Sequence, residues 1–222
     1  MTTTDQSSIG QPTRSAAPAL PPVVSAQEWQ QARDELMVLE KQATRSLDAL
    51  AARRRRLPAM RFGNYEFTTA DGTTTLLDLF GDNNELVVYQ FMDAGPGNQC
   101  PGCTHFTRNV VNLGTLAREG VSWAHISEMP IEQITEITAR EGWTMPFVSS
   151  RGTTFFADNG VVGFMLMVYL RAGDDIYRTY TTGSRGVDRL MFLHNILDLT
   201  PYGRRQDWED SPEGWPQEPT YG

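Results

Sequence analysis

The sequence predicts an α/β fold with a mixed central sheet and a helical extension at its N-terminus. Two nearly continuous apolar runs, 85–92 and 121–127, are typical of strands buried on both faces of a parallel sheet. Helical spacing over 106–117 separates them, so strands and helices alternate and right-handed crossovers are expected. The segments 163–171 and 176–182 flank a Gly-Asp-Asp turn, which predicts a β-hairpin and adds antiparallel strands.

The extension is predicted to be a long amphipathic helix over residues 25–57. Ser25 and Glu28 have the spacing of a capping box, and the apolar residues that follow recur at steps of three and four. Such a stripe must pack on the main domain or on a partner subunit, so a homodimer through this helix is one expectation. Residues 1–24 are expected to be disordered, because they are rich in Ser, Thr, Pro and Ala.

The remaining elements follow from local signals between 58 and 202, the predicted main domain. A strand is expected over 62–69 and a short helix or turn over 76–80. A helix is expected over 131–141, since Gly142 supplies a C-cap, and a strand begins at 146. The last helix is expected over 187–197. The tail, 203–222, is polar with Pro and Trp, and its shape does not follow from the pattern.

Composition excludes some classes of function. The 222 residues carry a formal charge of −8, which argues against a nucleic-acid partner because cationic contacts to phosphate dominate such binding. No apolar run approaches the roughly 20 residues of a membrane helix, so no membrane partner is expected. The first residues lack the apolar region of an export signal. We therefore expect a cytoplasmic protein.

The only two cysteines form the motif Cys100-Pro101-Gly102-Cys103, directly after a buried strand and a glycine-rich loop. In a reducing cytosol so short a loop gains little from a structural disulfide. The predicted helix begins at this motif, and a helix N-terminus favours a thiolate through its unpaired N–H groups. We expect Cys100, at or just before the N-cap, to be the exposed nucleophile. Cys103, one turn on, is expected to be the more buried resolving thiol.

Two other readings of the same cysteines stay open. His105 completes a Cys-x-x-Cys-x-His pattern that could bind zinc or copper, although a continuing helix would turn this histidine roughly 200° away from Cys103. The cysteines could also be core residues of a non-catalytic scaffold. His125 in a predicted buried strand and His194 near an apolar helix face are interpreted as core residues.

A second element, Thr144-Met145-Pro146, stands at the start of a predicted strand. A proline at this position is usually strand punctuation, and only about 5–6% of X–Pro bonds are cis. Together with the cysteines, however, the proline favours a functional cis bond.

Cys-Pro-Gly-Cys after a buried strand, followed some forty residues later by Thr-Met-Pro, resembles the thioredoxin superfamily. The resemblance implies a three-layer α/β/α sandwich in which Pro146 is cis, faces Cys100 and Cys103, and positions substrate together with Thr144 and Met145. Residues 25–203 also look like a bacterial family of unknown function described as predicted dithiol–disulfide oxidoreductases. Phe91-Met92, Val148-Ser149-Ser150 and 197–201 carry that likeness.

The expected function is therefore thiol–disulfide exchange without a cofactor. The substrate would be a disulfide-containing protein or a small thiol compound, and an external electron donor would close the cycle. The chain departs from thioredoxins by Gln99 before the motif and by Pro-Gly within it, so a thioredoxin-like potential does not follow. Gly97 stands where peroxiredoxins have threonine, which puts peroxidase activity in doubt.

Overall fold

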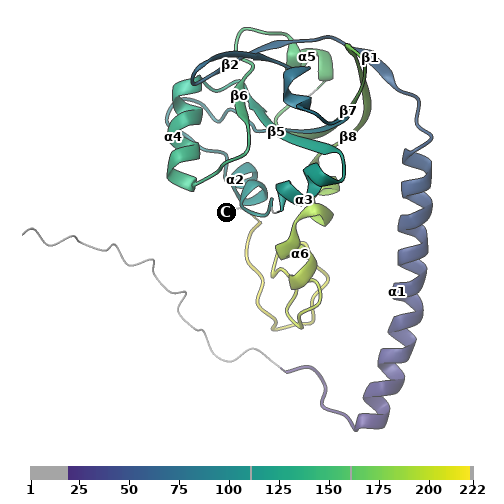
Figure 1. Cartoon of the computed structure of the whole chain (residues 1–222). Coiled ribbons are helices and arrows are strands. Elements are labelled where there is room, and N and C mark those ends of the chain that lie inside the picture. Colours follow the sequence, from purple (N-terminus) through teal and green to yellow (C-terminus); the bar gives the residue numbers. More distant parts are fainter. Residues whose placement is uncertain (1–19, 111, 161, 221–222) are drawn as a thin grey trace, which may run out of the picture.

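A mixed eight-stranded sheet forms the centre of the computed structural model, which describes residues 20–110, 112–160 and 162–220 (Figure 1). The strand order is β1-β8-β7-β4-β5-β6-β2-β3. Parallel pairing joins β4, β5 and β6, while the other neighbours are antiparallel. This confirms the predicted α/β class. The strands are β1 Met60–Phe62, β2 Glu66–Thr69, β3 Gly72–Thr75, β4 Glu85–Gln90, β5 Val121–Ser127, β6 Phe147–Ser149, β7 Met165–Ala172 and β8 Asp175–Thr182.

Side chains of β4 alternate between two apolar cores, one on each face of the sheet. Leu86 and Val88 belong to a core that contains Phe155, whereas Tyr89 and Phe91 belong to a core that contains Phe106. The strand is thus buried on both faces, as its sequence predicts. The aromatic rings of Tyr89 and Phe106 stack with their centroids 4.3 Å apart, which fixes the helix of Phe106 on this face.

Helices cover both faces of the sheet, which gives the three layers of an α/β/α sandwich. On the Tyr89 face lie α2 (Pro101–Arg108), α4 (Ile131–Glu141) and the 3₁₀ helix η2 (Ser184–Leu190), and on the opposite face lie η1 (Asp78–Phe80) and α5 (Phe155–Asn159). The short helices α3 (Leu113–Arg118) and α6 (Phe192–Leu197) complete the set. Only three residues separate β1 from β2 in the chain, although five strands lie between them in the sheet order. The sheet must therefore curl around the Phe155 core.

The N-terminal extension is the helix α1 (Ala26–Arg54), which extends away from the sheet domain (Figure 1). Its capping box is formed as predicted: Glu28 N donates to Ser25 Oγ at 3.3 Å, and Ser25 N donates to Glu28 Oε2 at 2.9 Å. None of its residues is buried. Of the expected disordered segment 1–24, residues 1–19 lie outside the described part. Within the described ranges, no helix is long and apolar enough to cross a membrane.

Three predicted elements are divided in the structure. The strand expected over 62–69 is two strands, and Asn64 between them accepts a hydrogen bond from Leu77 N at 3.0 Å. The helix expected over 106–117 is two helices: α2 ends at Arg108, and α3 begins after its N-cap Asn112, which has a left-handed φ of 59°. The last predicted helix, 187–197, is η2 followed by α6. Apolar spacing continues through each of these breaks, which is why the sequence pattern did not reveal them.

Candidate active site

Cys100 is the N-cap of α2, in agreement with the sequence prediction. Its Sγ accepts a hydrogen bond from the backbone N–H of Cys103 at 3.3 Å, and Pro101 occupies the first turn. Proline is tolerated there because this N–H would have no partner within the helix. Met92 N, at the end of β4, donates to Cys103 Sγ at 3.4 Å. Strand end and helix start therefore hold the two sulfurs together.

The loop between β4 and α2 is fixed by polar contacts. Gly95 and Gly97 have φ of 90° and 71°, a region that favours glycine. The amide of Gln133, on α4, donates to Gly95 O at 3.3 Å and to Asn98 O at 2.9 Å. Gly95 N donates to the carboxylate of Asp93 at 2.8 Å. The start of α2 is thereby tied to both β4 and α4.

The two thiols have opposite pKa shifts. The hydrogen bond from the Cys103 thiol, helped by the backbone N–H groups of Cys103 and Gly102, lowers the pKa of Cys100 to about 6 although burial acts against it. The same hydrogen bond, together with burial, raises the pKa of Cys103 well above its ordinary range. Cys100 is thus the thiol that ionises near neutral pH, and Cys103 stays protonated as its donor.

Burial follows the predicted order but not the predicted extent. Cys103 is fully buried, and Cys100 is only 5% exposed, so the expectation of an exposed Cys100 is wrong. The glycine-rich loop does not open the motif to solvent. Instead, Cys100 borders a cavity of about 400 Å³, which we call the thiol cavity.

The walls of the thiol cavity are largely apolar and come from distant parts of the chain. Tyr89, Met92, Phe106, Phe164, Val187 and Met191 surround Cys100. Polar groups of η2 also border it, and so do Gln206, Trp208 and Thr220 of the C-terminal segment. This segment has no periodic apolar pattern, so its return to α2 (Figure 1) was not predicted. The two tryptophans of this largely polar tail, Trp208 and Trp215, were the available signal.

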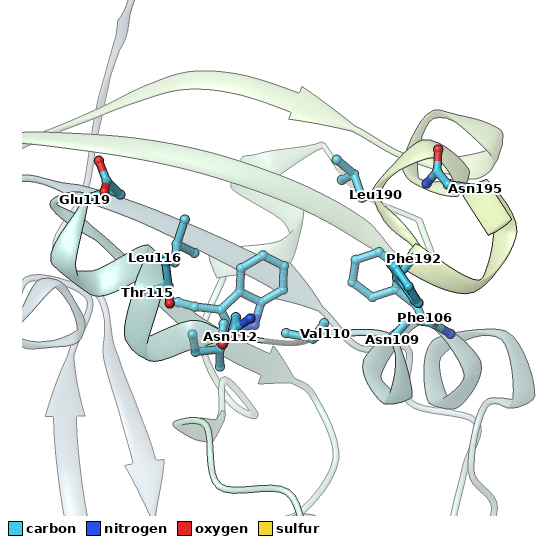
Figure 2. Close-up of a pocket in the computed structure, with 12 residues that line it drawn as sticks. Phe106, Asn109, Val110, Asn112, Thr115, Leu116, Glu119, Leu190, Phe192 and Asn195 are labelled. Carbon is cyan, nitrogen blue, oxygen red and sulfur yellow. The ribbon is translucent and has the colours of Figure 1, made fainter.

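A second, larger cavity of about 620 Å³, shown in Figure 2, shares Phe106 with the lining of the thiol cavity. Its lining includes Val110, Leu116 and Trp123, with Phe192 from α6. The described residues that line it include no cysteine or histidine. It therefore offers no nucleophile comparable to Cys100, and the thiol cavity is the candidate active site.

The structure places Thr144, Met145 and Pro146 away from the thiol cavity. Pro146 is exposed, and its carbonyl accepts a hydrogen bond from His125 N at 2.8 Å. Thr144 and Met145 line a separate cavity beside Thr107, near the C-terminal end of α2. Among the described residues no peptide bond is cis, which corrects the expected cis bond at Pro146. The position of these three residues away from the thiol cavity follows from strand direction. Because β6 runs parallel to β4, it begins at the opposite edge of the sheet from the one where β4 ends.

The segment that does face the dithiol is Gly163-Phe164, at the start of β7. This strand is antiparallel to β4 and pairs Met165 with Gln90, so it begins where β4 ends. The amide of Gln90 donates to Gly163 O at 3.0 Å, and Phe164 lines the thiol cavity. The sequence marked this stretch as half of a hairpin but gave no sign of its partner strand.

His105 and His194 contact each other, and His125 lies in the core. His105 Nε2 lies 3.2 Å from His194 Nε2, so the histidine of the zinc or copper hypothesis contacts α6. His125 is a buried core residue as predicted: Trp123 Nε1 donates to its Nδ1, and Thr107 contacts its Nε2, both at 3.2 Å. Burial lowers the pKa of His125 to about 3. Over the described ranges, no group of three or more His, Cys, Asp or Glu side chains could hold a metal ion.

Comparison with known protein families places the chain. A family model described as "Bacterial protein of unknown function (DUF899)" matches residues 18–221. The chain belongs to this family. The match spans α1, the sheet domain and the C-terminal segment, so all three are parts of the DUF899 unit. The search of curated proteins found no match.

Solved structures resemble the DUF899 chain only distantly. A hypothetical protein from Sinorhizobium meliloti 1021 is 18% identical, with a TM-score of 0.46 over 56% of this chain and 69% of its own. Peroxidoxin BcpB from Mycobacterium tuberculosis is 18% identical, with a TM-score of 0.44 over 55% and 86%. A thiol:disulfide interchange protein from Bacteroides sp. is 10% identical, with a TM-score of 0.41 over 50% and 74%.

Proposed function

We propose that this DUF899 protein is a thiol–disulfide oxidoreductase in which Cys100 is the nucleophile and Cys103 the resolving thiol. The observation that carries the proposal is the position of Cys100 as N-cap of α2, with its sulfur accepting a hydrogen bond from Cys103 N. With a pKa of about 6 this thiol is mostly ionised at neutral pH. The thiolate, not the thiol, attacks disulfides.

In the first step, Cys100 Sγ attacks one sulfur of a disulfide R–S–S–R′. The Cys100–S–S–R bond forms, the substrate bond breaks, and R′–S⁻ leaves and takes up a proton. In the second step, Cys103 loses its proton and attacks Cys100 Sγ. The Cys100–Cys103 disulfide forms and R–S⁻ leaves. The substrate gains two electrons, the dithiol loses two, and an external thiol reductant restores the dithiol.

A redox titration tests this proposal on the full-length, metal-free protein. The protein is equilibrated in glutathione buffers of graded potential, remaining thiols are alkylated, and the Cys100–Cys103 disulfide is quantified by mass spectrometry. Known oxidoreductases span about −270 mV for thioredoxin, with a thiol pKa of about 7, to about −120 mV for DsbA, with about 3.5. Since the pKa of Cys100 is about 6, we expect a midpoint between these limits. A pair that stays reduced throughout would contradict the proposal.

A further inference from the structure

The C-terminal segment that follows α6 (residues 199–220) forms part of the wall of the thiol cavity. Gln206, Trp208 and Thr220 border the same cavity as Cys100, although more than a hundred residues separate them in sequence. Cys100 is 5% exposed with this segment in place. Residues outside the sheet and its helices therefore take part in covering the nucleophile.

The segment is held by charged and aromatic contacts to η2 and to Asp198 at the end of α6. Arg204 donates to both carboxylate oxygens of Asp198, at 2.7 and 2.6 Å, and to Asp188 at 3.0 Å. The Arg204 side chain is itself only 9% exposed, and bidentate pairs of this kind are the strongest arginine–carboxylate contacts. The guanidinium of Arg185 lies 3.5 Å from the centre of the Trp208 ring. These contacts stabilise the C-terminal segment in its position against the thiol cavity.

The size of the cavity limits what reaches Cys100. A volume of about 400 Å³ falls at the lower end of the roughly 300–1,000 Å³ typical of small-molecule sites. A disulfide of a folded protein would have to displace Trp208 before its sulfur met Cys100, whereas a small disulfide could enter the cavity with Trp208 in place.

The chemistry of the cavity walls further limits which substrates can reach Cys100. Phe106, Phe164, Val187 and Met191 leave few polar partners near the sulfur. The charged groups that border the cavity, Arg185 and Asp188, are already paired with each other at 3.5 Å. Burying a charged substituent here would leave its charge without an unpaired opposite charge on the lining. An alkyl or aryl substituent gains from the same walls.

We propose that the substrate is a low-molecular-weight disulfide with apolar alkyl or aryl substituents, and that the C-terminal segment excludes protein disulfides. This inference rests on the proposed function, because it assigns a substrate class to the same dithiol. One substrate disulfide accepts two electrons and two protons and leaves as two apolar thiols, while Cys100 and Cys103 become a disulfide.

The test compares three disulfides on the reduced full-length protein: dipropyl disulfide, oxidised glutathione and insulin. The rate of Cys100–Cys103 disulfide formation is measured by thiol trapping. Each rate is divided by that of the same disulfide with dithiothreitol, which removes differences in leaving group. We expect dipropyl disulfide to exceed the other two at least tenfold. An equal or higher ratio for insulin or glutathione would overturn the substrate class alone, and oxidation by none of the three would overturn the proposed function as well.

A pair of variants tests the closure. Trp208→Ala removes the ring that borders the cavity, and Trp215→Ala is the matched control because Trp215 packs on Tyr202 within the same segment. We expect Trp208→Ala to raise the normalised rate with insulin at least fivefold and Trp215→Ala to leave it within twofold. An unchanged insulin rate in Trp208→Ala would refute exclusion by this segment.

Discussion

The pH profile of Cys100 reactivity tests the hydrogen bond from Cys103 directly. With a pKa of about 6, about 90% of Cys100 is thiolate at pH 7, against about 3% for an ordinary cysteine with a pKa of about 8.5. The nucleophilicity of a thiolate falls as its pKa falls, with a Brønsted slope of about 0.4–0.5. This lower nucleophilicity cancels roughly tenfold of the thirtyfold gain in thiolate fraction. The rate at one pH is therefore a weak test, and the midpoint of the profile is a strong one.

The assay is alkylation by iodoacetamide from about pH 4 to pH 9, with the Cys100 peptide quantified by mass spectrometry. Because the pKa of Cys100 is lowered, its reactivity should be full above neutral pH and should fall by half near pH 6. Cys103→Ala removes the thiol donor but leaves the backbone N–H groups. Its midpoint should rise by at least one pH unit yet stay below about 8.5.

Cys103→Ser is the control, because a hydroxyl can donate to the Cys100 thiolate where a methyl cannot. Its midpoint should stay closer to that of the unchanged protein than the Cys103→Ala midpoint does. A midpoint near 8.5 in the unchanged protein would refute the electrostatic reasoning. A midpoint that Cys103→Ala does not move would show that the Cys103 thiol is not the main cause.

Three further predictions concern turnover, substrate contact and assembly. Cys100→Ser should lower disulfide turnover at least about a hundredfold, while Cys103→Ser should accumulate a mixed disulfide visible by mass spectrometry; equal turnover by both would refute the assigned roles. Phe164→Ala should raise the KM for dipropyl disulfide about tenfold, or ~1.4 kcal/mol, whereas Pro146→Ala should leave this KM unchanged. A KM raised by Pro146→Ala and not by Phe164→Ala would show that Pro146 belongs to the site. Deleting residues 25–57 should convert a dimer to a monomer in light scattering, since Leu39 of α1 is 60% exposed; an unchanged mass would exclude α1 as the interface.

Local signals predicted those parts of the molecule that local physics decides. The capping box of Ser25 and Glu28 marked the start of α1, and the apolar run ending at Met92 marked a strand buried on both faces. The N-cap position of Cys100 followed from the order of strand, loop and helix. Each of these depends on neighbours within a few residues.

The rest depends on which strands pair, and the sequence does not state this. Pro146 and Phe164 both precede strands, but only β7 is antiparallel to β4 and starts beside the dithiol. The separation of β1 from β2 depends likewise on β1 pairing with β8 and β2 with β3. The docking of Trp208 depends on Arg185, which is distant in sequence. Such contacts leave no periodic trace in the chain.

The hydrogen bond between the two thiols orders the two steps of the proposed reaction. While Cys100 is a thiolate, it holds the proton of Cys103 and raises the pKa of that thiol, so Cys103 does not compete as nucleophile. Formation of the mixed disulfide removes the negative charge from Cys100 Sγ. The cause of the raised pKa at Cys103 then disappears except for burial, and Met92 N still donates to its sulfur at 3.4 Å. Cys103 therefore becomes the better nucleophile only after Cys100 has reacted.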